Sequence, residues 1–261
     1  MSATTDCYDL PQYWDLAFSE DTVAEADFLE AAAARYCSFP VRSILEPGCG
    51  GGRLVLELSR RGFEVTGWDA SRNAVDYAEK RLLSEGLSAE LSVCDMTHTQ
   101  TSAPVDLAHC FVNTFRHILT EESAVRHLRN VAKSLRPGGL YVIGMHLLPP
   151  DADEEDEEQW SVADGGTNVR IQLDVAECNR AKREEVLRFH MSVESEEFDG
   201  VKTFSSDYRM RIYQASDVLR LFESVPEFEL LDVYDFWYDI DEPLTLSDEL
   251  GDTVFVLRRK N

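Results

Sequence analysis

The fold of this chain is decided by Ile44-Leu45-Glu46-Pro47-Gly48-Cys49-Gly50-Gly51-Gly52, a short apolar run that leads into a glycine-rich turn. The apolar run predicts a strand, and residues 53–61 predict a helix with Leu54, Val55 and Leu58 on its inner face. Glycine lets a backbone approach a ligand closely and adopt positive φ angles. We therefore expect a strand, a ligand-binding turn and a helix in this order.

Strands and helices alternate along the chain on both sides of this turn. We expect helices at 21–36, 72–85 and 121–135, a further helix from Ser216, and other strands at 63–69, 91–95, 105–112, 140–145, 229–238 and 253–258. Such alternation predicts parallel strands with helices on both faces of the sheet. The expected fold is α/β, with a doubly wound, Rossmann-like, seven-stranded and mostly parallel sheet.

Residues 151–213 interrupt this pattern. Seven of the eight residues from Asp151 to Glu158 are acidic, which favours a solvated loop. Three β-rich stretches follow at 168–176, 185–195 and 201–213, and they predict an antiparallel meander. We expect one main domain, residues 1–150 with 214–261, and an insertion of an acidic loop and an antiparallel β lid, residues 151–213.

The charge and the cysteines limit the partners and the location. Lys and Arg total 25 against 49 Asp and Glu, and the net charge of −24 repels nucleic acids and anionic membranes. The cysteines form no C-x-x-C pair, so we expect a reduced, cytoplasmic protein without a metal site. The first 15 residues lack the basic and apolar regions of a signal peptide.

The spacing around the glycines indicates a nucleoside or a dinucleotide as the ligand. Asp69 ends a predicted strand 21 residues after Gly48, where its carboxylate can accept both hydroxyls of a ribose. A dinucleotide-binding fingerprint would need a small residue at the position of Arg53, so that helix and strand can pack closely. The bulky Arg53, together with the absence of a Tyr-x-x-x-Lys pair, argues against an NAD-dependent oxidoreductase, which is kept as the alternative.

Five motifs in chain order resemble those of the class I S-adenosylmethionine-dependent methyltransferases. They are 44–52, 67–71, 93–96, 111–118 and 135–140. The resemblance implies S-adenosyl-L-methionine as the cofactor. It also implies binding roles for residues at the strand ends, namely Glu46, Gly48, Gly50 and Gly52 at the methionine and ribose, Asp69 and Ala70 at the ribose, Asp95 and Met96 at the adenine, and Phe111 and Asn113 near the sulfur.

An aromatic segment near the N-terminus also resembles the family. In several small-molecule members such a segment covers the cofactor, and Tyr13 and Trp14 are the residues expected to do so here. The same two side chains could instead anchor the first helix. Both interpretations stay open from the sequence.

Methyl transfer from a sulfonium is an in-line displacement, so orientation can supply most of the acceleration. A general base is needed only when the nucleophile holds its proton. His117 and His146 follow the fourth and fifth strands and are the candidate catalytic residues, whereas His109 lies within the fourth strand and is expected in the core. The alternative interpretation of each is a packed or solvent-exposed histidine.

The acceptor is expected to be a small molecule with an amine or a hydroxyl group. Family members that methylate nucleobases or glutamine carry Asn/Asp-Pro-Pro-Tyr/Phe after the fourth strand, where this chain has Phe111-Val112-Asn113-Thr114. Arg209 or Arg211 in the meander could hold an acceptor carboxylate or pair with surface acids. A non-catalytic protein that binds the cofactor or a partner is a further alternative.

Overall fold

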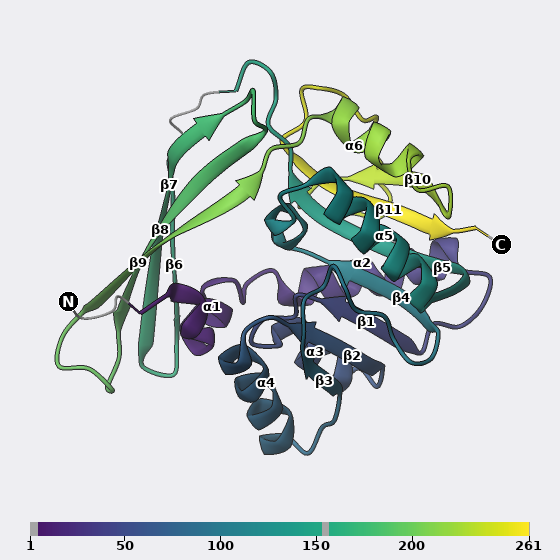
Figure 1. The fold of residues 1–261 in the computed structure, drawn as a ribbon. Helices are drawn as coiled ribbons and strands as arrows, with labels where there is room; N and C mark the ends of the chain where they lie inside the picture. Colours follow the sequence, from purple (N-terminus) through teal and green to yellow (C-terminus); the bar gives the residue numbers. More distant parts are fainter. Residues whose placement is uncertain (1–4, 153–156, 261) are drawn as a thin grey trace.

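The computed structural model describes residues 5–152 and 157–260, and it confirms the predicted α/β class. A seven-stranded sheet has the order β10-β11-β5-β4-β1-β2-β3, with helices on both faces (Figure 1). β11 pairs antiparallel with β10 and with β5, and the other described pairs of neighbouring strands in this sheet are parallel. The strands are β1 (Ser43–Pro47), β2 (Glu64–Asp69), β3 (Glu90–Val93), β4 (Val105–Cys110), β5 (Leu135–His146), β10 (Phe228–Tyr234) and β11 (Asp252–Arg259).

The helices bury one apolar core on each face of this sheet. α5 and α6 contribute Leu128 and Leu221 to one core, and α2 and α3 contribute Phe28 and Leu54 to the other. No described helix is long and apolar enough to cross a membrane. The helices are η1 (Cys7–Asp9), α1 (Pro11–Ala17), α2 (Thr22–Tyr36), α3 (Arg53–Arg60), α4 (Arg72–Ser84), η2 (Thr114–His117), α5 (Glu121–Ser134) and α6 (Ala215–Glu223).

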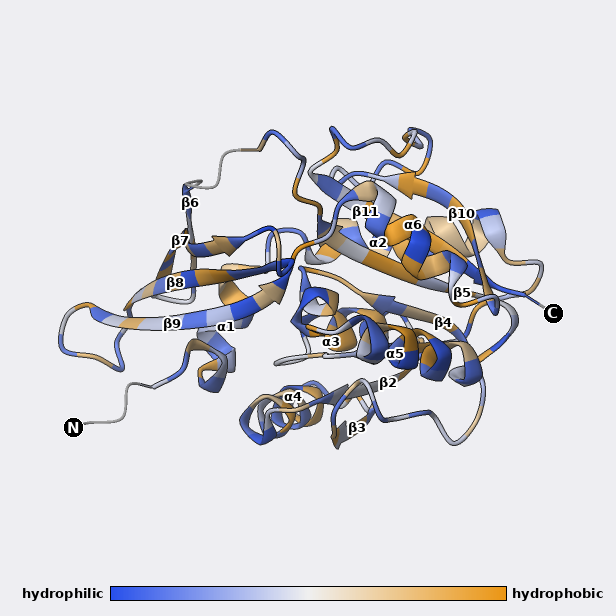
Figure 2. Ribbon diagram, turned by 45° about the horizontal axis from the view of Figure 1, so that its top comes forward, coloured by the Kyte–Doolittle hydropathy of each residue, from blue (hydrophilic) through white to orange (hydrophobic). Residues whose placement is uncertain are grey.

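A second, antiparallel sheet has the order β6-β7-β8-β9. Its strands are β6 (Glu157–Asp164), β7 (Thr167–Asn179), β8 (Glu184–Glu194) and β9 (Lys202–Arg211). Hydrophilic and hydrophobic residues alternate along β7 and β8 (Figure 2), as expected for strands with one covered face. This sheet lies within the predicted insertion 151–213, whose bounds stay a prediction.

β6 is a strand that the sequence pattern does not predict. Glu157 and Glu158 were expected in an acidic loop, but they pair with β7 at the edge of the sheet, where charged side chains remain in water. The hairpin turns at Gly165 and Gly166, whose φ angles are +55° and +81°. Two-residue hairpin loops favour glycine for this reason. Residues 153–156 of the acidic run lie outside the described part of the chain.

The second sheet packs against the N-terminal segment. Ile171, Phe189 and Tyr208 share an apolar cluster with Tyr13 of α1, and Trp160 Nε1 donates a hydrogen bond to the carbonyl of Ala17 over 2.8 Å. Figure 1 shows α1 beside the second sheet, at the side of the molecule where the first sheet ends. The insertion therefore holds η1 and α1 in place.

Candidate active site

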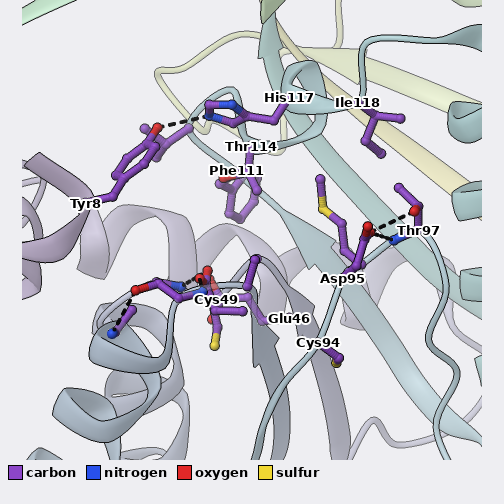
Figure 3. A pocket seen from close by; sticks show the side chains of 18 of the residues that line it. Tyr8, Glu46, Cys49, Cys94, Asp95, Thr97, Phe111, Thr114, His117 and Ile118 are labelled. Atoms are coloured by element: carbon purple, nitrogen blue, oxygen red, sulfur yellow. Dashed lines mark hydrogen bonds between the residues drawn. The ribbon is translucent and has the colours of Figure 1, made fainter. Parts of the chain in front are cut away.

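A cavity of about 660 Å³ lies at the carboxyl ends of the central strands β1, β2 and β4. Ligands of doubly wound sheets bind at this edge. Tyr8 and His117 lie at the top of the cavity in Figure 3, and Asp95 lies to the right. The lining comes from η1, α1, the glycine turn, the ends of β2, β3 and β4, η2 and the start of α5.

The glycines of the turn serve different purposes. Gly48, Gly50 and Gly52 all have left-handed φ angles, of +74°, +53° and +80°. A Cβ atom on Gly48 would lie 2.4 Å from Cγ2 of Thr114, and one on Gly52 would lie 2.8 Å from Cβ of Ala78. A Cβ atom on Gly50 would meet nothing within 4 Å, and Gly50 lines the cavity. Two of these glycines therefore permit packing, and the third leaves space for a ligand.

Asp69 fastens the turn from the end of β2. Its Oδ2 accepts a hydrogen bond from the Gly50 amide over 2.9 Å, and its Oδ1 accepts one from the Ser71 amide over 2.7 Å. Asp69 and Ala70 both line the cavity. A carboxylate has further lone pairs, so Asp69 can still accept hydrogen bonds from two ligand hydroxyls.

Asp95 lies after β3 at the other side of the cavity (Figure 3). Its Oδ1 accepts hydrogen bonds from the amide and the hydroxyl of Thr97, each over 2.7 Å. Partial burial raises the pKa of Asp95, but the bonds from Thr97 outweigh it and hold the pKa below its usual value. Asp95 is therefore an anionic acceptor beside Met96, which also lines the cavity.

Asp15 joins the N-terminal helix α1 to the glycine turn. Its Oδ2 lies 2.6 Å from Nη1 of Arg81 on α4, and the same nitrogen lies 3.3 Å from the carbonyl oxygen of Gly51. Burial raises the pKa of Asp15 to about 6, although Arg81 acts in the opposite direction. The ion pair fixes α1 against the cavity.

Tyr8 and His117 form the polar pair at the top of the cavity. The Tyr8 hydroxyl lies 2.9 Å from Nε2 of His117, and the Tyr8 ring stacks on Tyr208 of β9 with 4.1 Å between centroids. Val112 and Asn113 have φ angles of 51° and 61°, and this sharp bend directs the chain from β4 into η2, which carries His117. Burial lowers the pKa of His117 to about 4, so its imidazole is neutral near pH 7.

The cavity brings together most of the residues chosen from the sequence. The predicted residues that line it are Trp14, Glu46, Gly48, Gly50, Asp69, Ala70, Asp95, Met96, Phe111 and His117. Their roles toward a cofactor or an acceptor stay predictions.

Four predicted residues lie outside this lining. The Tyr13 hydroxyl points the other way and donates to Glu197 over 2.7 Å. Gly52 packs on α4, as described above. Asn113 Oδ1 accepts a hydrogen bond from the His146 amide over 2.8 Å, and His146 Nδ1 lies 2.6 Å from Asp252 of β11. We therefore exclude Tyr13 and His146 from the proposed roles below.

Residues of the N-terminal segment were missed. Tyr8 and Asp15 line the cavity, together with Pro11, Trp14 and Phe18. Helical spacing would have found Asp15, because Pro11, Trp14, Asp15 and Phe18 follow the i, i+3, i+4, i+7 pattern of one helix face, whereas Tyr13 falls on another.

The insertion contributes to the cavity only indirectly, because none of the described residues of β6–β9 lines it. Arg209 pairs with Glu184 over 2.8 Å. Arg211 donates to the carbonyl of Leu119 over 2.8 Å and lies 3.2 Å from Glu121. Both arginines thus pair within the protein, and the structure offers no support for their contact with an acceptor.

Comparison with known proteins shows similarities to methyltransferases in sequence and in fold. Residues 44–139 match the model of a methyltransferase domain. A solved S-adenosylmethionine-dependent methyltransferase of Clostridium acetobutylicum superposes with a TM-score of 0.76 over 98% of this chain and 100% of its own, at 16% identity. Residues 44–139 of this chain therefore match a methyltransferase domain, and the chain as a whole shares the fold of the solved structure.

Other similarities of this chain concern its fold or a part of its sequence. The sugar N-methyltransferase KedS8 of Streptoalloteichus has a TM-score of 0.73 at 20% identity, over 100% of this chain and 96% of its own. The cypemycin N-terminal methyltransferase of Streptomyces is 34% identical over 38% of this chain and 39% of its own. The ubiquinone biosynthesis O-methyltransferase of Azoarcus is 32% identical over 40% of this chain and 44% of its own. The chain thus spans less than half the length of these two curated relatives.

Proposed function

We propose that this chain transfers the methyl group of S-adenosylmethionine to a nitrogen or oxygen atom of a small molecule. One observation carries the proposal. A single cavity is lined by an open glycine turn, by Asp69 at the end of β2, by Asp95 after β3 and by the Tyr8–His117 pair. The first three features suit a nucleoside with an amino-acid arm, and the fourth suits an acceptor that carries a proton.

The residues of the cavity fit S-adenosylmethionine in size and chemistry. Gly50 leaves space beside the backbone, and Glu46 has one buried carboxyl oxygen, Oε2, without a hydrogen-bond partner among the described residues. Asp69 would hold the ribose hydroxyls and Asp95 the adenine amino group, while Met96 would pack near the adenine ring. The bound cofactor supplies a methyl group on a positively charged sulfur, which is a good leaving group.

The N-terminal segment would exclude water and position the acceptor. Trp14 and Phe18 line the cavity from α1 and the residue that follows it, and Asp15 holds α1 on the glycine turn. Excluding water and fixing the direction of approach are the main contributions that a protein makes to such a displacement.

His117 would accept the proton of the acceptor. Its imidazole is neutral near pH 7, and the Tyr8 hydroxyl beside Nε2 fixes its orientation. An amine that binds in its neutral form would need His117 for orientation and for the proton released on methylation. A hydroxyl acceptor would need it as a general base.

The nature of the acceptor is supported by the charge of the chain and by the named relatives. KedS8 is a sugar N-methyltransferase, and the Azoarcus relative is an O-methyltransferase of ubiquinone biosynthesis. We propose a small-molecule acceptor of one of these two atom types, and no nucleic acid, since the net charge of −24 repels phosphate backbones. A cytoplasmic location stays a proposal from the cysteine pattern.

The geometry around Arg53 does not favour the alternative of an NAD-dependent oxidoreductase. Arg53, at the position where a dinucleotide site needs a small residue, lies at the start of α3, and its guanidinium contacts Glu25 of α2 through both terminal nitrogens. Arg53 and Glu25 are thus part of the packing between two helices.

The test is methyl transfer from S-adenosylmethionine carrying a labelled methyl group to a panel of amino sugars, other small amines and phenols. We expect labelled product and an equal amount of S-adenosylhomocysteine with at least one class. Tight binding of S-adenosylhomocysteine without turnover on any acceptor would instead support the non-catalytic alternative.

A further inference from the structure

His109 is a buried histidine whose ring has no hydrogen-bond partner in the described part of the chain. It lies on the central strand β4 and is 0% exposed, and both Nδ1 and Nε2 lack a partner among the described residues. A buried polar group without a partner costs free energy. A function at this position would explain why the chain places a histidine there.

The sheet places His109 directly beside Glu46. In the parallel pairing of β1 with β4, Ile44 lies opposite Leu107 and Leu45 opposite Ala108. The next pair in this register is Glu46 and His109, and both side chains lie on the face covered by α2 and α3. His109 Nε2 lies 3.9 Å from Glu46 Oε2, the carboxyl oxygen for which the described residues provide no hydrogen-bond partner. A shift of about 1 Å would bring these atoms within hydrogen-bond distance.

The neighbouring charges leave Glu46 available for a cation from the cavity. Arg53 is held by Glu25, and Arg81 is held by Asp15. Glu46 is buried except where it lines the cavity, and among the described residues it makes no ion pair with an arginine or lysine. Burial raises the pKa of Glu46 well above its usual value, with Glu25, Asp15 and Asp69 adding to this and Arg53 opposing it. A positively charged ligand group would therefore stabilise the Glu46 carboxylate.

A neutral donor suits this position better than a cation. Burial and the nearby Arg53 lower the pKa of His109 to about 3, so the ring is uncharged near pH 7. A lysine or arginine would neutralise Glu46 and compete with a cationic ligand. A neutral N–H group can orient the carboxylate and leave its charge intact.

We infer that His109 is a positioning residue, which donates from Nε2 to Glu46 Oε2 and so directs the carboxylate of Glu46 toward the α-ammonium group of the cofactor. This inference rests on the proposed function, because it requires S-adenosylmethionine in the cavity. His109 contacts Glu46 and not the ligand, and it would act on affinity for one end of the cofactor only.

The experiment compares two ligands by calorimetry. S-Adenosylhomocysteine carries the α-ammonium group, and 5′-methylthioadenosine has the same adenosine and sulfur without the amino-acid end. His109→Leu removes the donor, and His109→Gln retains an N–H group near Nε2. We expect His109→Leu to weaken the binding of S-adenosylhomocysteine about tenfold, because it loses a hydrogen bond to a charged group. His109→Gln keeps a donor and should weaken this binding less than about threefold. Neither variant should change the affinity for 5′-methylthioadenosine.

Two further variants complete the test. His109→Phe fills a similar volume without a donor and replaces His109→Leu if that variant does not fold. In a Glu46→Gln background, replacing His109 by Leu should lower the affinity for S-adenosylhomocysteine by less than a further threefold, because the charge that His109 orients is already gone. An unchanged affinity for S-adenosylhomocysteine in the donor-free variants, or an equal loss for both ligands, would overturn the inference. No binding of S-adenosylhomocysteine to the unmodified protein would instead contradict the proposed function.

Discussion

Tyr8 and His117 are separated by 109 positions in the sequence, and the Tyr8 hydroxyl lies 2.9 Å from Nε2 of His117. The contact joins the N-terminal segment to the loop that follows β4. Tyr208 of the second sheet stacks on Tyr8. The insertion thus supports the proposed acceptor side of the cavity without lining it. The contact also distinguishes His117 from His146, the other candidate base, which lies outside the cavity lining.

Replacing His117 should reduce turnover more than cofactor affinity. We expect His117→Ala to lower kcat by about a hundredfold, the lower end of the range for lost general-base catalysis, and Tyr8→Phe by about tenfold. The Kd of S-adenosylhomocysteine should change less than about threefold in both variants, as measured by calorimetry. His146→Ala should leave kcat nearly unchanged, since His146 pairs with Asp252 outside the cavity. A larger loss of kcat with His146→Ala than with His117→Ala would reverse the assignment.

The pH profile of turnover should show no acidic limb from His117 near pH 6.5. Burial lowers the pKa of His117 to about 4, so its neutral form predominates above about pH 5. kcat/KM measured from pH 5 to 8 should therefore have the same shape for the unmodified protein and for His117→Asn, at a lower level in the variant. A limb near pH 6.5 that disappears only in His117→Asn would show that the histidine titrates at its ordinary pKa.

His127 should make the fold sensitive to acid. Its Nδ1 lies 2.9 Å from the carbonyl oxygen of Met96 and its Nε2 lies 2.7 Å from the Tyr141 hydroxyl, and burial lowers its pKa to about 4. The unfolded chain then binds a proton more readily, so the stabilisation is present above about pH 6.5 and is lost as the pH falls toward 4. The loss is on the order of 3 kcal/mol.

Denaturant unfolding at pH 7 and pH 5 measures this contribution. His127→Gln should be less stable than the unmodified protein at pH 7, because it loses a buried hydrogen bond. The difference in unfolding free energy between the two pH values should be smaller in the variant. An equal difference in both proteins would mean that His127 does not titrate as described.

Asp69 should contribute to cofactor binding through both of its oxygens. Asp69→Ala should weaken the binding of S-adenosylhomocysteine by on the order of 2–4 kcal/mol, because hydrogen bonds to a charged acceptor are lost and the Gly50 amide loses its partner. Asp76→Ala on α4 is the matched control, since Asp76 pairs only weakly with Arg72 and lies outside the cavity lining. An unchanged Kd in Asp69→Ala would remove the ribose assignment.

The glycine turn and the strand ends could be predicted from the sequence because local pattern alone determines them. An apolar run followed by Gly48 and Gly50 defines the end of β1. Asp69 is the last residue of β2, and Asp95 follows β3. In a doubly wound sheet these ends meet at one edge. The order of the elements was sufficient to bring their side chains together.

The contacts that close the cavity could not be predicted, because they join distant parts of the chain. The pairing of Asp15 with Arg81 depends on how α1 packs against α4. His146 is directed away because β11 places Asp252 beside it, a neighbour that only the sheet order reveals. β6 was missed because an edge strand tolerates the charges that its sequence carries.

The most direct test of the proposed cofactor is a calorimetric titration of the unmodified protein with S-adenosylmethionine, S-adenosylhomocysteine and NAD. The open space at Gly50 and the acceptors at Asp69 and Asp95 predict micromolar binding of the first two ligands. The position of Arg53 predicts no binding of NAD. Binding of NAD alone, or of none of the three, would contradict the account.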